Sequence, residues 1–201
     1  MSRILGLFGS LASSFKDKFL FLVRGLRTAN KVVFLDMMRP QDIVILVKLV
    51  SLKDKPWHYR DLSAGLFIPL SEISASLKRS EKAGLYGAEV RSVHRLALME
   101  FIQYGLKYVF PTSPGAMVTG LGTAHSHPYY IGFFPAEMQY AWPDEKGDIR
   151  GLMIEPLHPN VSKAAGKDEL LYKLLASIDI LRVGKVREIK MAMDELKKAI
   201  L

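Results

Sequence analysis

The chain has 201 residues, of which 49% are hydrophobic and none is cysteine, and its formal net charge is +8. This size and hydrophobicity suffice for a buried core and argue against wholesale disorder. The lack of cysteine excludes disulfides, thiolate metal ligands and a cysteine nucleophile, as expected for a protein of the reducing cytoplasm. The basic excess favours an acidic partner such as nucleic acid.

Residues 1–36 differ in composition from the rest of the chain. They contain six Lys or Arg residues and two Asp residues, and therefore half of the net charge. They hold no run of the ~20 apolar residues that a membrane-spanning helix needs, and no convincing signal-peptide cleavage site. Three interpretations remain: a basic amphipathic extension on an anionic membrane surface, a helix that docks on the body, and a translation start at Met37 or Met38. We favour the last because the composition changes there.

The first helix of the folded part is predicted to begin at Pro40, with Asp42 in its first turn. An apolar stripe at helical spacing follows, formed by Ile43, Leu46, Val47 and Val50. The β-branched run 43–47 is also compatible with a strand, but the proline start and the helices that follow favour a helix. Residues 53–56 are predicted to form a turn.

Two short helices with a tight break are predicted over residues 57–86. Leu62 and Leu66 share one face of the first helix, which ends before Pro69 because proline disfavours helical backbone at the residue before it. The second helix covers about residues 70–83. Its outer face carries small, polar and cationic side chains, which enter a DNA major groove without steric conflict: Ser71, Ser74, Ala75, Lys78 and Lys82. The alternative is a helical hairpin inside a core.

This segment resembles the helix-turn-helix of winged-helix bacterial regulators of the MarR group. The matching residues are Leu62-Ser63-Ala64, Ser71-Glu72-Ile73-Ser74, Leu77-Lys78-Arg79 and Ala83-Gly84-Leu85. Two positions depart from the family, since Phe67 stands where glycine is usual and Pro69 where a serine cap is usual. Phenylalanine in left-handed backbone is strained, so we expect a turn of different shape, with Ser71 as an alternative cap.

The resemblance implies that the second helix binds DNA. The residues that it places at bases are Ser71, Ser74 and Lys78, with Ala75 allowing close approach. The residues that it places at phosphates are His58, Arg60, Arg79 and Lys82. Regulators of this group usually bind inverted repeats, which implies a homodimer. The dimer contact would come from the predicted helix 94–107 or from the C-terminal helices.

A wing should follow the second helix, but residues 86–93 accommodate only one short strand. The wing is therefore predicted to be reduced or completed by a later strand. Arg91 and Arg95 are the cations best placed to contact phosphate at that edge; the alternative is that both are solvated surface charges.

The remaining elements are predicted from periodicity and turn residues. Residues 94–107 form a helix with Leu98, Phe101, Ile102 and Leu106 on one side. Residues 111–130 form a long irregular stretch, and Met138–Trp142 and Ile149–Ile154 form two strands. Two antiparallel helices close the chain. The first begins at Lys167 or Asp168 and ends at a left-handed Gly184, and the second carries the apolar stripe Val186, Ile189, Met193, Leu196 and Ile200. Basic residues gather at their joint, where they complement the helix dipole or, less favoured, contact phosphate: Arg182, Lys185, Arg187 and Lys190.

The sequence His125-Ser126-His127-Pro128 matches the core motif of JAMM-type zinc hydrolases. Two histidines one residue apart can both reach a metal from a strand. The aspartate that supplies the third ligand in that family is replaced by Met138 here. We therefore interpret His125 and His127 as partly exposed loop residues, and a metal-dependent hydrolase as the least favoured function.

The sequence as a whole predicts a mainly α-helical fold with a few short strands. A basic extension (1–36) precedes a winged-helix-like domain of three helices with a reduced wing (37–110) and an α+β region that ends in a helical hairpin (111–201). No nucleotide, flavin or pyridoxal phosphate motif is recognisable. We therefore expect a non-enzymatic, cofactor-free regulator that binds double-stranded DNA, or alternatively a protein-interaction adaptor built on a degenerate winged helix.

Overall fold

The computed structural model describes residues 37–53, 55–134 and 138–201, and the predictions for residues 1–36 lie outside these ranges. Met38–Leu201 form one compact unit. Its helices up to residue 109 are α2 (Pro40–Ser51), α3 (Tyr59–Leu66), α4 (Leu70–Lys82), α5 (Arg95–Glu100), the π-helical turn η1 (Phe101–Gly105) and α6 (Leu106–Val109). Later helices are the 3₁₀ turn η2 (Ala124–Ser126), α7 (Val161–Ala165), α8 (Glu169–Val183) and α9 (Val186–Ile200). The strands are β1 (Tyr86–Gly87), β2 (Ser92–Val93), β3 (Met117–Gly122), β4 (Tyr140–Pro143) and β5 (Ile149–Met153).

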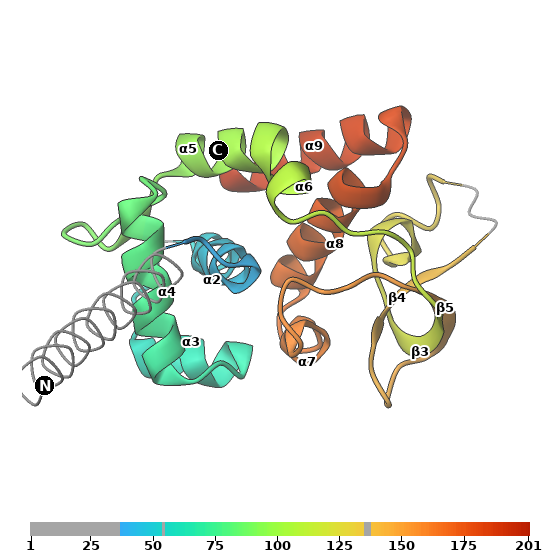
Figure 1. Ribbon diagram of the computed structural model, residues 1–201, viewed down its shortest axis with the longest axis horizontal. Helices are drawn as coiled ribbons and strands as arrows, with labels where there is room; N and C mark the ends of the chain where they lie inside the picture. Colours follow the sequence, from blue (N-terminus) through green and yellow to red (C-terminus); the bar gives the residue numbers. More distant parts are fainter. Residues whose placement is uncertain (1–36, 54, 135–137) are drawn as a thin grey trace, which may run out of the picture. The chain divides into compact units, whose positions relative to one another are not determined.

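The described chain is mainly helical with a few short strands, as predicted (Figure 1). Within the described ranges, no helix is both long and apolar enough to cross a membrane.

Helix α2 lies in the middle of the core. The run 43–47 is helical, as favoured from the sequence, and Ile43 and Ile45 are both fully buried although they point to opposite sides of the helix. A helix buried on all sides needs neighbours on all sides, and α2 contacts α3, α4, α8 and α9. The two regions predicted to meet at residue 110 therefore share one core and are not separate compact units.

The break between α3 and α4 takes three residues, Phe67–Pro69. Phe67 adopts left-handed backbone, with φ 55° and ψ 37°, so the expectation of a differently shaped turn is wrong. The Ser63 hydroxyl donates to the carbonyl of Ile68 at 2.7 Å and ties the turn to α3. Pro69 is the N-cap residue of α4, and Ser71 lies inside the helix rather than capping it.

A short antiparallel hairpin follows α4. Tyr86 pairs with Val93 and Gly87 with Ser92, so two short strands form where the sequence predicted one. The helical stretch after the hairpin runs from α5 through η1 to α6, close to the predicted 94–107. Of the four residues predicted for its apolar side, Leu98, Ile102 and Leu106 are buried and Phe101 is half-buried.

Part of the predicted irregular stretch 111–130 is strand β3, so that prediction is wrong. β3 is antiparallel to both β4 and β5, which are parallel to each other. Gly120 pairs with both Pro143 and Ile149, and a Cβ there would lie 1.9 Å from the Trp142 carbonyl oxygen. Only glycine permits three backbones to approach so closely.

The C-terminal helices α8 and α9 form the predicted hairpin. Asp168 caps α8, accepting the Leu171 N–H at 2.9 Å. Gly184 ends α8 in extended backbone, φ −78° and ψ 165°, and not in the predicted left-handed conformation. Val186 is exposed and does not belong to the buried stripe of α9.

Candidate nucleic-acid interface

The inner side of α4 is attached to α2 by a buried ion pair. Arg79 donates to Asp42 through Nε to Oδ2 at 2.9 Å and through Nη2 to Oδ1 at 2.6 Å, and the two side chains are 4% and 0% exposed. The hydrogen bonds from the guanidinium to the Asp42 carboxylate raise the pKa of Arg79. Arg79 was predicted to contact phosphate, and this is wrong because its guanidinium is covered and already paired.

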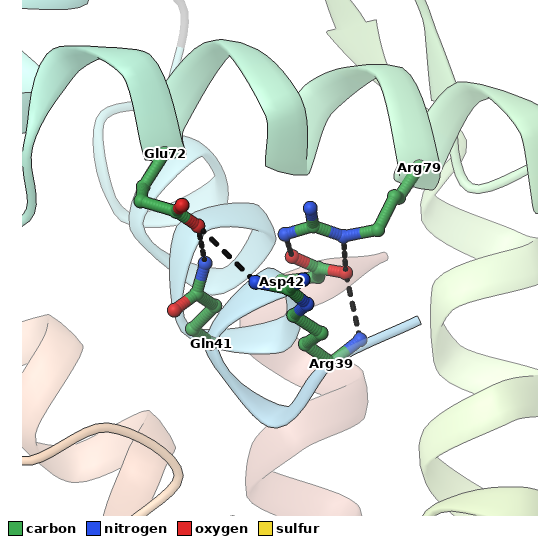
Figure 2. A network of polar contacts seen from close by, with 5 residues as sticks. All are labelled: Arg39, Gln41, Asp42, Glu72 and Arg79. Atoms are coloured by element: carbon green, nitrogen blue, oxygen red, sulfur yellow. Dashed lines mark hydrogen bonds and ion pairs between the residues drawn. The ribbon is translucent and has the colours of Figure 1, made fainter. Parts of the chain in front are cut away.

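A second attachment lies two helical turns earlier on the same side of α4 (Figure 2). One carboxylate oxygen of Glu72, Oε2, accepts from Gln41 Nε2 at 2.8 Å and from Arg39 Nη1 at 3.5 Å. Asp42 also accepts the backbone N–H of Arg39 at 2.8 Å, where a carboxylate favours the start of α2. These contacts fix the orientation of α4 about its own axis.

With α4 held in this way, the face opposite its buried residues Ile73, Ser76 and Ser80 points outward. At 100° per residue, the five predicted residues 71, 74, 75, 78 and 82 lie on one face. Ser71, Lys78 and Lys82 are exposed, whereas Ser74 and Ala75 are half-buried. An acidic residue that the prediction did not include, Glu81, is exposed at the edge of this face. We call the five residues the α4 outer face.

Cationic residues flank the α4 outer face on neighbouring elements. His58 and Arg60 are exposed at the start of α3, and Arg91 is exposed on the hairpin. The Arg91 guanidinium lies 4.4 Å from the centre of the Trp57 ring and donates to the Trp57 carbonyl at 3.1 Å. Trp57, which the sequence did not single out, therefore joins the hairpin to the segment before α3.

Three apolar side chains lie exposed near the start of α4. Leu70 is 47% exposed, and Tyr59 and Phe67 are 37% exposed each. Leu70 and Tyr59 line a cavity of about 460 Å³ together with His58, Arg60 and Asp61. Sequence periodicity did not predict this apolar surface, because Leu70 is compatible with the expected helix start whether its side chain is exposed or buried.

The two histidines of the predicted metal motif are buried, not partly exposed. The His127 ring lies 4.0 Å from the Tyr172 ring, and its Nδ1 accepts the Tyr129 N–H at 3.0 Å. Burial, with a smaller effect of Lys173, lowers the pKa of His127 to about 4. Burial also lowers the pKa of His125, whose Nδ1 lies 3.7 Å from Glu188 Oε2.

These histidines are not part of a recognisable metal site. In the part of the chain that the structure describes, no group of three or more His, Cys, Asp or Glu side chains could hold a metal ion.

A scan against models of protein families, a search of curated proteins and a search of solved structures each found no match to this chain.

Proposed function

We propose that this protein is a non-enzymatic transcriptional regulator of the cytoplasm, which binds double-stranded DNA as a homodimer and inserts α4 into the major groove. The observation that carries the proposal is the α4 outer face: a helix held from behind by Asp42 presents small, hydroxyl and cationic side chains to the solvent. The order of three helices followed by a short hairpin supports a winged-helix type.

The side chains of the α4 outer face suit the edges of base pairs. Ser71 and Ser74 carry hydroxyls that both donate and accept hydrogen bonds, and Lys78 can donate to the O6 and N7 acceptors of guanine. Ala75, between them, adds little bulk and lets the helix approach the groove floor. The small size of these residues distinguishes this face from the buried side of α4, which holds Ile73 and Leu77.

Phosphate contacts would come from both sides of α4. His58 caps the start of α3 and Arg60 lies in its first turn, both before α4 in the chain. Lys82 lies in the last turn of α4, and Arg91 lies on the hairpin that follows. Contacts on either side of a recognition helix set its register on the duplex without carrying sequence information.

The proposed dimer contact lies on the helical stretch from α5 to α6. Its outer side exposes Leu96, Tyr104 and Tyr108, of which Tyr104 is 68% exposed. Large apolar side chains on one helical surface are typical of subunit contacts, and two copies related by a twofold axis would bind two half-sites.

The proposal is tested by fluorescence anisotropy with a labelled duplex from the region upstream of the gene, in competition with unrelated duplex. We expect specific binding that Lys78→Gln weakens by at least about tenfold, the cost of one charged contact. Lys190→Gln is the matched control, because Lys190 is an exposed lysine of α9 and carries the same charge. Equal binding by both variants would refute the role of α4.

A protein-interaction adaptor is the second candidate, and the exposed apolar residues near the start of α4 favour it. Leu70, Tyr59 and Phe67 would lie against polar DNA in the first proposal but would bury well against a protein partner. The replacement Leu70→Ser separates the two. An adaptor loses its partner on this change, whereas a DNA-binding protein keeps its duplex affinity within about threefold.

A further inference from the structure

A cavity separate from the α4 outer face lies between the hairpin and the segment that joins α2 to α3. Its volume is about 430 Å³, within the range of small-molecule sites. Leu49 and Val50 of α2 and Val93 of β2 contribute apolar lining. Leu49 and Val50 belong to the buried core, so this side of the cavity is apolar and preformed.

Cationic side chains line the same cavity. They come from three parts of the chain: Lys53 and Lys55 after α2, Arg91 on the hairpin and Arg95 at the start of α5. No described residue of the lining is Asp or Glu; Asp54 lies outside the described residues. Four like charges around one cavity repel each other, and a bound anion relieves that repulsion.

The two arginines are held in place by contacts that leave most of their donors for a ligand. A guanidinium has five N–H donors. Arg91 stacks on Trp57, donates to its carbonyl and also forms a side-chain hydrogen bond with Tyr86. Arg95 donates through Nη1 to the Ile200 carbonyl at 3.0 Å. Held guanidinium groups suit the planar, bidentate recognition of phosphate.

We infer that this cavity binds a small organic phosphate, with the phosphate between Arg91 and Arg95 and an apolar body against Trp57, Leu49 and Val50. An organic phosphate would cover the apolar side of the cavity, whereas inorganic phosphate would leave that side uncovered. The cavity shares Arg91 and His58 with the proposed duplex contacts, but the inference holds whether or not the protein binds DNA.

The test uses phenyl phosphate as a probe and the two tryptophans of the chain as reporters in ¹⁵N–¹H correlation spectra. Trp57 lines the cavity, whereas Trp142 is buried elsewhere, with its Nε1 donating to Asp179 at 2.7 Å. We expect the Trp57 indole signal to shift in a saturable way while the Trp142 signal stays. Phenol and inorganic phosphate should each bind at least about tenfold more weakly, since each lacks one half of the interaction.

Substitutions locate the site. Arg91→Gln and Arg95→Gln should each weaken phenyl phosphate by at least about tenfold, and Lys53→Gln, at an exposed loop position, should weaken it several-fold without affecting the fold. Lys190→Gln on α9 should leave it unchanged. The inference is overturned if phenyl phosphate gives no saturable shift, if both indole signals move together, or if Trp57 responds only to a short duplex and not to phenyl phosphate. The last outcome would assign the cavity to the DNA backbone.

Discussion

At the scale of single residues, the pair between Asp42 and Arg79 decides which side of α4 faces the solvent. The carboxylate has no exposed surface and accepts three hydrogen bonds, two from Arg79 and one from the Arg39 backbone. A charge buried to this extent depends on its partner. Glu72 makes its contacts on the same side of the helix, but it is 41% exposed and its ion pair with Arg39 is long.

The two attachments should therefore differ in strength. Arg79→Met removes the partner of a buried carboxylate and should lower the free energy of unfolding by about 3–5 kcal/mol. Glu72→Gln keeps the hydrogen-bond acceptor for Gln41 and loses a half-exposed pair, so it should cost less than about 1 kcal/mol. Urea unfolding of both variants measures this. Equal losses would show that the Asp42–Arg79 pair does not hold α4.

The burial of His127 makes the stability of the folded protein depend on pH in the acidic range. The unfolded chain takes up a proton near the ordinary histidine pKa of 6.5, whereas the folded chain does so only near 4. Between these values the unfolded state binds more protons, so stability falls as the pH is lowered through this window. The full loss is about 3 kcal/mol, at 1.36 kcal/mol per pKa unit, and it is absent above pH 6.5.

The comparison of wild type with His127→Asn isolates this effect. The asparagine side-chain oxygen can accept the Tyr129 N–H in place of Nδ1 but does not titrate. Urea unfolding between pH 7 and pH 4 should show a smaller loss of stability in the variant than in the wild type. Two parallel curves would mean that His127 is protonated equally in both states.

At the scale of elements, backbone conformation at single positions shapes the region between α4 and the hairpin. Gly84 has φ +73°, and a Cβ added there would meet no atom within 4 Å. Gly84→Ala should therefore cost about 1 kcal/mol from backbone strain alone. Gly132 also has open space around it but no positive φ, so Gly132→Ala should be neutral or slightly stabilising. Chemical unfolding of the pair checks this, and equal effects would contradict it.

The small sheet depends on Gly120 for a different reason, the close approach of neighbouring backbones. Gly120→Ala places a Cβ against the Trp142 carbonyl, and the strands must separate, at a cost of about 3 kcal/mol. Thr119→Ala changes an exposed neighbour on the same strand and should stay within about 0.5 kcal/mol. Thermal unfolding distinguishes the two variants. A wild-type Tm for Gly120→Ala would show that the three strands are less closely packed.

At the scale of the whole molecule, local signals in the sequence predicted the long helices, whereas the short helix α7 (Val161–Ala165) was not predicted. Pro40 and Asp42 marked the start of α2, Asp168 capped α8, and apolar spacing located the buried side of α5 to α6. These features depend on residues within a turn or two of one another, so their physical cause is contained in the local sequence.

Contacts between distant residues could not be predicted in the same way. The partner of Arg79 lies 37 residues earlier, and without it the arginine resembled a phosphate contact. β3 was missed because its partners come from β4 and β5 later in the chain and because Gly120 and Gly122 are typical of turns. The sequence held one signal that Arg79 belongs to the attached side of α4. Glu72 and Arg79 lie two turns apart and therefore on the same side of that helix.

The α4 outer face is tested most directly at Ala75. Its side chain has neither a polar group nor a charge, so a substitution there affects DNA binding only through the size and charge that it adds. Ala75→Glu adds a carboxylate where the groove would lie. It should therefore lower the affinity for the upstream duplex at least about a hundredfold relative to wild type. Ala199→Glu, at a half-buried position of α9, makes the same change away from this face and should leave binding intact. Wild-type affinity in Ala75→Glu, with the fold unchanged by circular dichroism, would contradict the account.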